Sequence, residues 1–465
     1  MNAMLGMERL SDVALRVGGI LHGPDAPFQR VVSDSRQLRR GDLFIALAGE
    51  NFDGHNYVAK AASLGAAGAL VARYVEGGGP QILLPDDSDD TLSALQAYAA
   101  SWRRDFDLPV VAVTGSSGKT TTKQMLVAVL AARGPVLATE GNLNNHIGVP
   151  LTLLRLRTEH RTAVIEMGAN HAGEIALLAQ LARPDIGIVT QAGDAHLEGF
   201  GSRAGVARAK GELFAALHAP GIAIINADDA YAPLWRELAA KANVLSFGFA
   251  DGADVRALDC VGIPEHGPVA TAFTLQAPDG SCRVELPLPG RHNVANALAA
   301  AAAGVALGLD VETIAAGLAR VAPVAGRLNW LQTPEGARLL DDSYNANPTS
   351  LRAALDLLAG LPGERRLVLG EMRELGADAP MLHEEAGRAA RAFGIERLYT
   401  LGSLAQHAAA GFGARAEAFD AIDDLVAAVR DDLGPQVTVL VKGSRGARME
   451  RVVAALTGST AQEAH

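Results

Sequence analysis

The sequence predicts an α/β protein with three domains. The chain has 465 residues, and single domains hold about 150 residues as a soft average. Short apolar segments typical of buried strands alternate with helical patterns along most of the chain, which favours mostly parallel sheets covered by helices. The pattern changes near residue 85 and again near residue 323, and these changes mark the predicted domain boundaries.

The N-terminal domain is predicted to span residues 1–85 as a small α/β unit, because turn residues separate its short apolar runs. These runs are VVSDSR, LFIAL and GALVA. Residues 86–107 cover most of the charged segment PDDSDD and continue with the helical pattern TLSALQAYAASWRRDF. A charged turn followed by one amphipathic helix is typical of a connection between domains, so this segment is predicted to be a linker helix.

The central domain is predicted to span residues 108–322. A strand leads into a glycine loop, and a helix that is closed by Gly134 follows the loop. The other strand candidates are TAVIEMG, DIGIVTQAG and GIAIINADD, and the helix candidates include AGEIALLAQLAR and NVANALAAAAAGVALGL. Strands and helices that alternate at this spacing predict a parallel sheet with helices on both faces.

The C-terminal domain is predicted to span residues 323–465 and to form a second open α/β sheet. Four strand candidates are each followed by a helical stretch, namely RLLDDSYN, RRLVLGEM, RLYTLG and VTVLVKGS. The last residues, TGSTAQEAH, are predicted to be frayed because they are polar and terminal.

Composition argues against several classes of protein. The net charge of −11 argues against a protein that coats nucleic acid or an anionic membrane, although a few local cations can still hold a small anionic substrate. No segment approaches the roughly 20 apolar residues of a membrane helix, and the N-terminus lacks the pattern of an export signal. Two widely spaced cysteines, Cys260 and Cys282, predict reduced thiols and a cytoplasmic protein.

The strongest local signal is the segment Gly115–Thr120, which reads GSSGKT between a predicted strand and a predicted helix. Glycines let backbone N–H groups approach a phosphate, and the helix N-terminus adds partial positive charge. Lys119 is predicted to reach the outer phosphates, and the Thr120 hydroxyl is suited to Mg²⁺. The predicted ATP site comprises Gly115, Ser116, Ser117, Gly118, Lys119, Thr120 and Thr121.

This glycine loop has the short form G-x-x-G-K-T. The longer and more common form, G-x-x-x-x-G-K, needs a glycine five residues before Gly118. The chain has Val113 at that position. Other segments match in order along nearly the whole chain: SDSR (33–36), GDLFIALAGENFDGH (41–55), GNLNNHIGVPLTLL, VIEMGANHAGEI, AHLEGFGS, AGVARAKGELF, GRHNVANALAA (290–300), DDSYNANPTS (341–350) and KGSRGARME (442–450). Together with the loop, they resemble the Mur ligase family, and specifically its branch that adds D-alanyl-D-alanine.

The resemblance implies a small N-terminal domain that binds UDP, a central ATPase domain of the P-loop type with a parallel sheet, and a Rossmann-like C-terminal domain. It also implies ATP-dependent joining of D-alanyl-D-alanine to UDP-N-acetylmuramoyl-tripeptide through an acyl phosphate, a step of peptidoglycan synthesis. The implied cofactors are ATP, two Mg²⁺ ions and CO₂ bound as a lysine carbamate. The implied partners are these small molecules, with no nucleic acid and no membrane insertion, and the family implies a monomer.

Four residues are catalytic candidates: Lys119, Glu166, His196 and Lys210. Glu166 ends a predicted strand, where open α/β sheets bind ligands, and a carboxylate there can hold Mg²⁺. The resemblance implies that Thr120, His196 and Lys210 as its carbamate also bind Mg²⁺. Taken alone, a glutamate at a strand end can cap a helix, a loop histidine can be a bystander, and a lysine on a half-buried helix can extend its amine to solvent.

The remaining ATP candidates are implied by the resemblance and have plain alternatives. Asn293 and Asn296 match positions near the adenine, although one can cap a helix and the other can pack as a polar residue. Arg327 is suited to the transferring phosphate and Asp342 to the ribose, and each can equally form a salt bridge.

The UDP-sugar candidates are Ser35 and Arg36, and Asp53–His55 lies in the same part of the resemblance. An ordinary surface ion pair is the alternative for Arg36.

Three other functions share some of these features. A ligase for another Mur step has the same loop but other residues at DDSYNANPTS, and folylpolyglutamate synthase has the loop but normally lacks a unit like residues 1–85. A P-loop ATPase or kinase is expected to have the longer loop and a strand that ends in aspartate. Val113 and Glu166 argue against that class.

Overall fold

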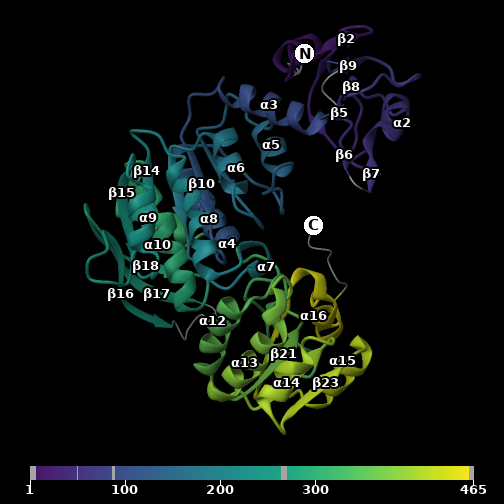
Figure 1. Cartoon of the computed structure of the whole chain (residues 1–465). Helices are drawn as coiled ribbons and strands as arrows, with labels where there is room; N and C mark the ends of the chain where they lie inside the picture. The colour runs from purple at the N-terminus through teal and green to yellow at the C-terminus, as the bar shows by residue number, and fades with distance from the viewer. Residues whose placement is uncertain (1–6, 50, 86–89, 263–269, 460–465) are drawn as a thin grey trace. The chain divides into compact units, whose positions relative to one another are not determined.

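The computed structural model describes residues 7–49, 51–85, 90–262 and 270–459. The start of the predicted linker, residues 86–89, and the end of the predicted frayed tail, residues 460–465, lie outside the described residues. The chain divides into two compact units. Unit 1 comprises Met1–Val110, Pro135–Met167 and Leu177–Arg183, and unit 2 comprises Val111–Gly134, Gly168–Ala176 and Pro184–His465. Both units are mixed α/β (Figure 1), which confirms the predicted fold class.

Unit 1 contains a five-stranded sheet built from the N-terminal apolar runs. Its strand order is β2 (Ile20–His22), β9 (Gln81–Leu83), β8 (Gly68–Val71), β5 (Leu43–Ile45) and β4 (Val31–Val32). The last four strands are parallel, and β2 is antiparallel to β9. Phe44, Val58 and Val71 belong to the apolar cluster that covers this sheet. Unit 1 also holds the parallel pair β11 (Val136–Ala138) and β12 (Thr162–Glu166).

The helix predicted as a linker is α3 (Thr91–Arg103), and it is packed within unit 1. The Asp90 carboxylate caps its first turn by accepting a hydrogen bond of 3.0 Å from the Leu92 N–H. Trp102 and Arg103 are buried near its end, and the Arg103 guanidinium donates to the Ala182 carbonyl at 3.0 Å. The helix contacts α1 (Leu10–Val17) and α5 (Gly148–Leu153), and Figure 1 shows α5 beside it. The segment is therefore part of a core, and the predicted domain boundaries remain predictions.

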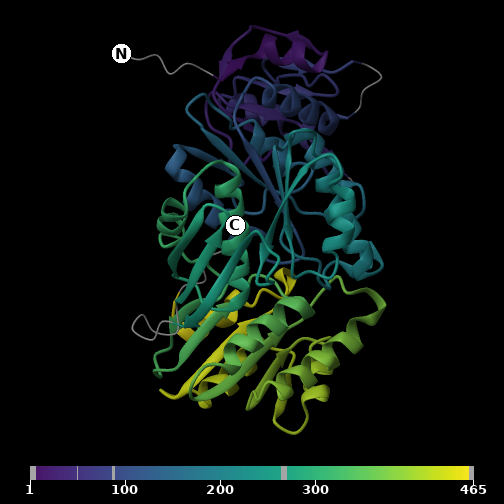
Figure 2. The ribbon, with the colours of Figure 1, turned by 90° about the vertical axis from the view of Figure 1, so that its left-hand side faces the viewer.

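Unit 2 contains a run of seven neighbouring strands that is parallel at one end and antiparallel at the other (Figure 2). The parallel part is β10 (Val110–Thr114), β13 (Ile186–Val189), β14 (Ile222–Asn226), β15 (Asn243–Gly248) and β16 (Val255–Gly262). Strands β17 (Thr271–Ala277) and β18 (Gly280–Leu286) then pair in antiparallel fashion. This antiparallel edge was not predicted, because its strands alternate between buried and exposed residues. Cys260 on β16 and Cys282 on β18 are both free.

Helix α10 (Arg291–Ala306) lies in the interior of unit 2. Residues Ala299–Ala303 are fully buried, as expected for a helix that is apolar on every side. The helix packs against α4 (Lys119–Leu130) and against strands β14 to β17. Since alanine side chains are short, the backbone of α10 can approach these neighbours closely, and this brings the start of α10 to the glycine loop.

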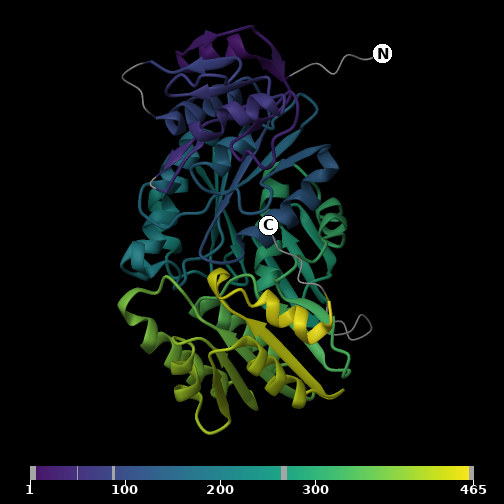
Figure 3. The same cartoon turned by 90° about the vertical axis from the view of Figure 1, so that its right-hand side faces the viewer.

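The C-terminal part of unit 2 contains a second α/β sheet, as predicted, and helices cover both of its faces. Its order is β19 (Asn329–Gln332), β20 (Arg338–Asp342), β24 (Val437–Lys442), β21 (Glu364–Gly370), β22 (Arg397–Leu401) and β23 (Ala416–Phe419). One apolar cluster joins the sheet to α12 (Pro348–Ala359), α13 (Ala379–Ala392) and α14 (Gln406–Phe412). A second cluster joins the other face to α15 (Ile422–Asp431) and α16 (Glu450–Thr457). The yellow strand β24 lies between green strands in Figure 3.

All strands of this sheet except β19 are parallel, so the loops after β20, β21 and β24 meet at one edge. None of the helices in the described part of the chain is long and apolar enough to cross a membrane.

Trp235 on α9 (Ala232–Leu238) fixes the position of α8 (Arg203–Ala215). It is fully buried, it packs edge-on against Phe214, and its indole N–H donates to the Ala207 carbonyl at 2.9 Å. We expect Trp235→Ala to lower the free energy of unfolding by about 3–5 kcal/mol, because the site loses a large buried side chain and a hydrogen bond. Denaturant unfolding of this variant and of Val261→Ala, whose side chain is half exposed, provides the measurement. A similar loss in both variants would contradict the assignment.

Candidate functional site

The glycine loop, residues 115–118, is held by two close contacts. Gly115 and Gly118 adopt φ values of +143° and +85°, a region that residues with a side chain rarely occupy. A Cβ atom on Gly115 would lie 1.9 Å from the Thr190 hydroxyl oxygen, and one on Gly118 would lie 2.3 Å from the Asn296 amide oxygen. The two positions therefore require glycine for conformation and for space.

Hydrogen bonds with the segment after β13 hold the glycine loop in place. The Thr190 hydroxyl donates to the Ser117 carbonyl at 2.6 Å. The Ser116 N–H donates to the Gln191 carbonyl at 3.0 Å, and the Ser116 hydroxyl accepts from the Gly193 N–H at 2.9 Å. Thr190 directly follows the buried strand β13, which pairs with β10. Ligand sites in parallel sheets form at the carboxyl ends of strands, and this rule could have identified Thr190 from the sequence.

Helix α4 begins directly at the loop, with Gly118 as its first cap residue and no side chain to cap the first turn. Thr120 and Thr121 lie in that turn and are half-buried. The Lys119 ammonium donates to the Gly115 carbonyl at 2.8 Å, so it folds back over the loop. A helix N-terminus, backbone N–H groups and a lysine in this arrangement form a suitable site for a phosphate.

The two asparagines of α10 are buried under the loop. Asn293 donates to the Pro289 carbonyl at 2.8 Å, and the Asn296 amide donates to the Asn293 side chain at 3.3 Å. Asn296 is also the group that closes the space beside Gly118. Its position fits the structural alternative of a polar support, and a contact with adenine stays a prediction.

The segment DDSYNANPTS reaches the loop from the C-terminal part of the chain. Asn347 caps α12 by accepting from the Ser350 N–H at 2.8 Å, and its amide donates to the Ser117 hydroxyl at 3.2 Å. Thr349 accepts from the Asp194 N–H at 3.0 Å. The sequence identified this segment as a marker of the family branch, but its contact with the loop was not predicted, because the partners are far apart in the chain.

Lys210 is the most deeply buried amine of the site. Its side chain lies on α8 and is almost completely buried, with the ammonium donating to the Ala169 carbonyl at 3.1 Å and standing 5.0 Å from the centre of the Phe200 ring. Burial, and to a smaller extent the positive charge of Lys119, lowers the pKa of Lys210 to about 7. The alternative of a lysine that extends to solvent is therefore wrong, and the amine is neutral in a substantial fraction of molecules near neutral pH.

His196 precedes the short helix α7 (Leu197–Phe200). Its ring contacts the edge of Phe200, with 6.5 Å between centroids, so Phe200 borders both His196 and Lys210. The His196 Nδ1 atom lies 2.5 Å from a carboxylate oxygen of Glu374, although the ring is not turned for a linear hydrogen bond. This contact lowers the pKa of Glu374 below its usual value. Glu374 was not predicted, because only the fold brings its loop to His196.

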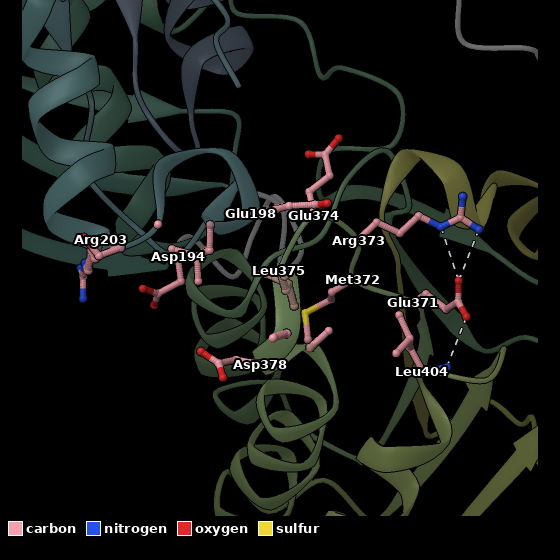
Figure 4. Close-up of a pocket in the computed structure, with 16 residues that line it drawn as sticks. Asp194, Glu198, Arg203, Glu371, Met372, Arg373, Glu374, Leu375, Asp378 and Leu404 are labelled. Atoms are coloured by element: carbon pink, nitrogen blue, oxygen red, sulfur yellow. Dashed lines mark hydrogen bonds and ion pairs between the residues drawn. The ribbon is translucent and has the colours of Figure 1, made fainter. Parts of the chain in front are cut away.

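A cavity of about 1060 Å³ opens between α7 and the loop after β21. We call it the acidic cavity, because five of its lining residues are Asp194, Glu198, Glu371, Glu374 and Asp378. Figure 4 shows these carboxylates on both sides of it, with Glu371 held by Arg373 and by the Leu404 N–H.

Glu166 lies in unit 1, whereas Lys119, His196 and Lys210 lie in unit 2. Glu166 is buried at the end of β12. One carboxylate oxygen accepts from the Asn144 amide at 2.9 Å, and the Glu166 N–H donates to the Thr139 hydroxyl at 2.9 Å. The side chain is thus oriented within its own unit.

Arg327 and Asp342 lie at the edge of the C-terminal sheet. The Arg327 guanidinium stacks over the Tyr344 ring at 4.4 Å, and Arg445 approaches the same ring at 5.5 Å. Asp342 forms an ion pair with the buried Lys442. The salt-bridge alternative is therefore present for Asp342, and nucleotide contacts by both residues remain predictions.

The predicted UDP-sugar residues lie in unit 1, after β4. Ser35 is half-buried, and Arg36 is exposed and paired with Asp34 at 2.7 Å. Nearby in sequence, Asp53 accepts from His55 at Nδ1 (2.7 Å) and is paired with Arg73, which lowers the pKa of Asp53 to about 2. Arg36 thus has the ion pair of the plain alternative, and its contact with a substrate is still a prediction.

The candidate Mg²⁺ ligands do not form a ready metal site without the carbamate. No group of three or more histidine, cysteine or acidic side chains gathers as a ready metal site within the described ranges. Mg²⁺ prefers oxygen ligands, and a carbamate on Lys210 would supply anionic oxygen where the unmodified residue supplies a cation. A buried amine with a lowered pKa suits that modification, which would give Lys210 the oxygen atoms that Mg²⁺ prefers.

Family models match three parts of the chain. The Mur ligase middle domain matches residues 113–304, the glutamate ligase domain of Mur ligases matches residues 326–445, and the Mur ligase family catalytic domain matches residues 27–76. A relative from Escherichia coli (strain K12), named UDP-N-acetylmuramoyl-tripeptide–D-alanyl-D-alanine ligase, is 46% identical over 97% of this chain and 98% of its own length. The chain belongs to the Mur ligase family.

Solved structures of Mur ligases agree with this assignment. A crystal structure of MurF from Acinetobacter baumannii has a TM-score of 0.90 at 37% identity and covers 97% of this chain and 98% of that one. The MurF ligase from Thermotoga maritima, solved in complex with ADP, has a TM-score of 0.81 at 28% identity and covers 92% and 97%. The resemblance on which the sequence analysis relied is thereby confirmed.

Buried Lys210 has a consequence for the stability of this Mur ligase. Its pKa is about 7 in the folded chain and 10.5 in an unfolded one, so between these values only the unfolded state binds the proton, and the free energy of unfolding rises with pH. Below pH 7 the Lys210 amine is protonated in both states, and the cost of burying its charge lowers the stability of the folded chain in full. We expect Lys210→Met to be more stable than the wild type by the largest margin below pH 7, and the margin to shrink toward pH 10.5.

Denaturant unfolding at several pH values, in buffer freed of CO₂, measures this margin. The exposed Lys241 supplies the matched variant Lys241→Met, for which a flat profile is expected. A flat profile for Lys210→Met as well would contradict the lowered pKa.

Proposed function

We propose that this Mur ligase joins D-alanyl-D-alanine to UDP-N-acetylmuramoyl-tripeptide and converts ATP to ADP and phosphate. The observation that carries the proposal is the Escherichia coli relative of that name, 46% identical over nearly the full length of both chains. The segment DDSYNANPTS, which touches the glycine loop through Asn347, supports the same branch of the family.

ATP is needed because a carboxylate is a poor electrophile with a poor leaving group. The tripeptide carboxylate attacks the γ-phosphorus in line and forms an acyl phosphate, and ADP leaves. Backbone N–H groups of the glycine loop and the N-terminus of α4 hold the phosphates. During the transfer, Lys119 leaves the Gly115 carbonyl and contacts the phosphoryl group. Its positive charge offsets the charge of that group.

Thr120, Glu166, His196 and the Lys210 carbamate are the residues that we assign to Mg²⁺. These residues would hold two Mg²⁺ ions, which would supply positive charge to the phosphate oxygens during transfer. The chain's own contribution is to bury Lys210 beside Phe200, which favours the neutral amine that can react with CO₂.

In the second step the amine of the dipeptide attacks the acyl carbon and phosphate leaves. This step requires the acyl phosphate to be kept from water. The acidic cavity lies beside His196 and contacts the C-terminal sheet, and we propose that the dipeptide enters the site from this C-terminal part of the chain.

The remaining assignments complete the proposal. Ser35 and Arg36 contact the UDP-sugar, Asn293 and Asn296 border the adenine and support the loop, and Arg327 and Asp342 contact the nucleotide. The enzyme is proposed to work as a monomer in the cytoplasm, as the sequence analysis predicts.

Phosphate release from ATP tests the reaction. The purified chain is incubated with Mg²⁺, bicarbonate, UDP-N-acetylmuramoyl-tripeptide and D-alanyl-D-alanine. In parallel reactions D-glutamate, L-alanine, lysine or diaminopimelate replaces the dipeptide, with the tripeptide substrate or with a shorter UDP-linked acceptor, and one reaction contains no amine. Release only with the dipeptide is expected. Release with a single amino acid and a shorter acceptor would assign another Mur step, and release without any amine would indicate a simple ATPase.

The glycine loop predicts a specific loss of ATP affinity. In Gly118→Ala, left-handed strain of about 1–2 kcal/mol adds to the clash with Asn296, so we expect KM for ATP to rise about tenfold or more. Gly252 has open space around its Cβ position, and Gly252→Ala is the matched control with unchanged KM. Equal KM values for the two variants would argue against a phosphate site at this loop.

The carbamate has its own test. Carbon-13 NMR of the chain in ¹³C-bicarbonate is expected to show a carbamate signal that is stronger at pH 8 than at pH 6, because the amine with a pKa of about 7 must be neutral to react. The signal should vanish in Lys210→Met and persist in Lys241→Met. A signal that survives in Lys210→Met would place the modification elsewhere.

A further inference from the structure

Two residues in uncommon backbone conformations meet at the edge of the acidic cavity. His196 has φ +55° and Glu374 has φ +63°, values that only a few per cent of residues other than glycine adopt. Their side chains approach to 2.5 Å between Nδ1 and a carboxylate oxygen. The backbone is joined as well, since the Glu198 N–H donates to the Glu374 carbonyl at 3.3 Å. Figure 4 shows Glu198 and Glu374 beside each other.

The contact places a carboxylate beside one ring nitrogen of His196, Nδ1. A carboxylate beside Nδ1 favours the tautomer with its proton on Nδ1, and this leaves the lone pair on Nε2. Histidines that bind metals are commonly held in this way by a carboxylate at the other nitrogen, which fixes both tautomer and ring orientation. At His196 the carboxylate of Glu374 stands 2.5 Å from Nδ1 without a hydrogen bond, and a turn of the ring that formed this bond would complete the arrangement. The carboxylate is supplied by a different sheet of the chain.

We propose that Glu374 is a positioning residue that orients His196 for the metal from the loop after β21, so that the metal site is complete only when this loop is seated against α7. The proposal rests on the proposed function, in which His196 is a metal ligand. It adds a residue from the C-terminal sheet to the ATP-binding side of the reaction. Seating of the C-terminal loop and readiness for phosphoryl transfer then become one event.

Other carboxylates of the acidic cavity do not occupy this position. Glu371 is engaged by Arg373 and by the Leu404 N–H. Asp378 lies at the start of α13, is exposed, and caps no N–H group of that helix with its side chain. The plain alternative for Glu374 is a surface ion pair, which contributes only about 0–1 kcal/mol to stability and predicts no effect on catalysis.

Four variants separate these alternatives: Glu374→Ala, Glu374→Gln, His196→Ala and the double variant His196→Ala/Glu374→Ala. Asp378→Ala and Asp378→Asn are the matched controls, because they remove a carboxylate from the same loop. Hydrogen–deuterium exchange of residues 195–200 and 371–378 is measured on the full chain without substrates. In addition, kcat and KM are measured for ATP and for UDP-N-acetylmuramoyl-tripeptide.

For Glu374→Ala we expect faster exchange in both segments and a fall in kcat of about 10- to 100-fold, the range seen when the outer partner of a metal-binding histidine is removed. KM for the UDP-linked substrate should stay unchanged. Glu374→Gln, which keeps an acceptor for Nδ1–H, should retain more activity than Glu374→Ala. In the His196→Ala background, loss of Glu374 should have no further effect, because the residue acts through His196. Both Asp378 variants should leave the exchange of residues 195–200 unchanged.

Additive losses in the double variant, or unchanged exchange of residues 195–200 in Glu374→Ala, would overturn the proposal. A wild-type chain that does not turn over the dipeptide would instead overturn the proposed function. The two failures are distinguishable, because the exchange measurements need no substrate and report on the Glu374–His196 contact directly.

Discussion

Close backbone approach at the glycine loop determines where the other groups of the site can lie. Gly115 rests against Thr190 at the end of β13, and Gly118 rests against Asn296 at the start of α10. Neither contact leaves room for a side chain, so strand, loop and buried helix must keep a fixed register. These contacts also fix the direction in which the N-terminus of α4 points, because α4 begins directly after Gly118. The glycine loop and Lys119, which are proposed to contact the phosphates, are therefore positioned by the interior of unit 2.

Electrostatics gives the site its second constraint. Lys119 folds over the loop, and its charge adds to burial in keeping the nearby Lys210 amine from holding a proton. An arrangement of this kind is unfavourable in an empty protein, since it concentrates like charge in a place that water does not reach. The proposed carbamate on Lys210 would replace one of the two amines with an anion and so remove this repulsion. Lys119 would then be the cation of the pair that offsets the charge of the nucleotide phosphates.

Local patterns allowed the glycine loop and the parallel strands to be predicted, because GSSGKT, its strand and its helix are adjacent in the chain. The family resemblance then supplied Glu166, His196 and Lys210. Two features could not be predicted from the sequence. The strands of the antiparallel edge alternate in burial and lack long apolar runs, and the contacts of His196 with Glu374 and of Ser117 with Asn347 join residues that only tertiary structure brings together.

The run Ala299–Ala303 in α10 has a consequence for how this chain can vary. All five side chains are fully buried, and a methylene group added to a well-packed interior costs about 1–3 kcal/mol. Surface helices can drift in sequence without harm, but α10 accepts almost no larger residue on any side. Mutational tolerance should therefore be lowest in a segment that looks chemically featureless, and random libraries of this enzyme would lose function there through size alone.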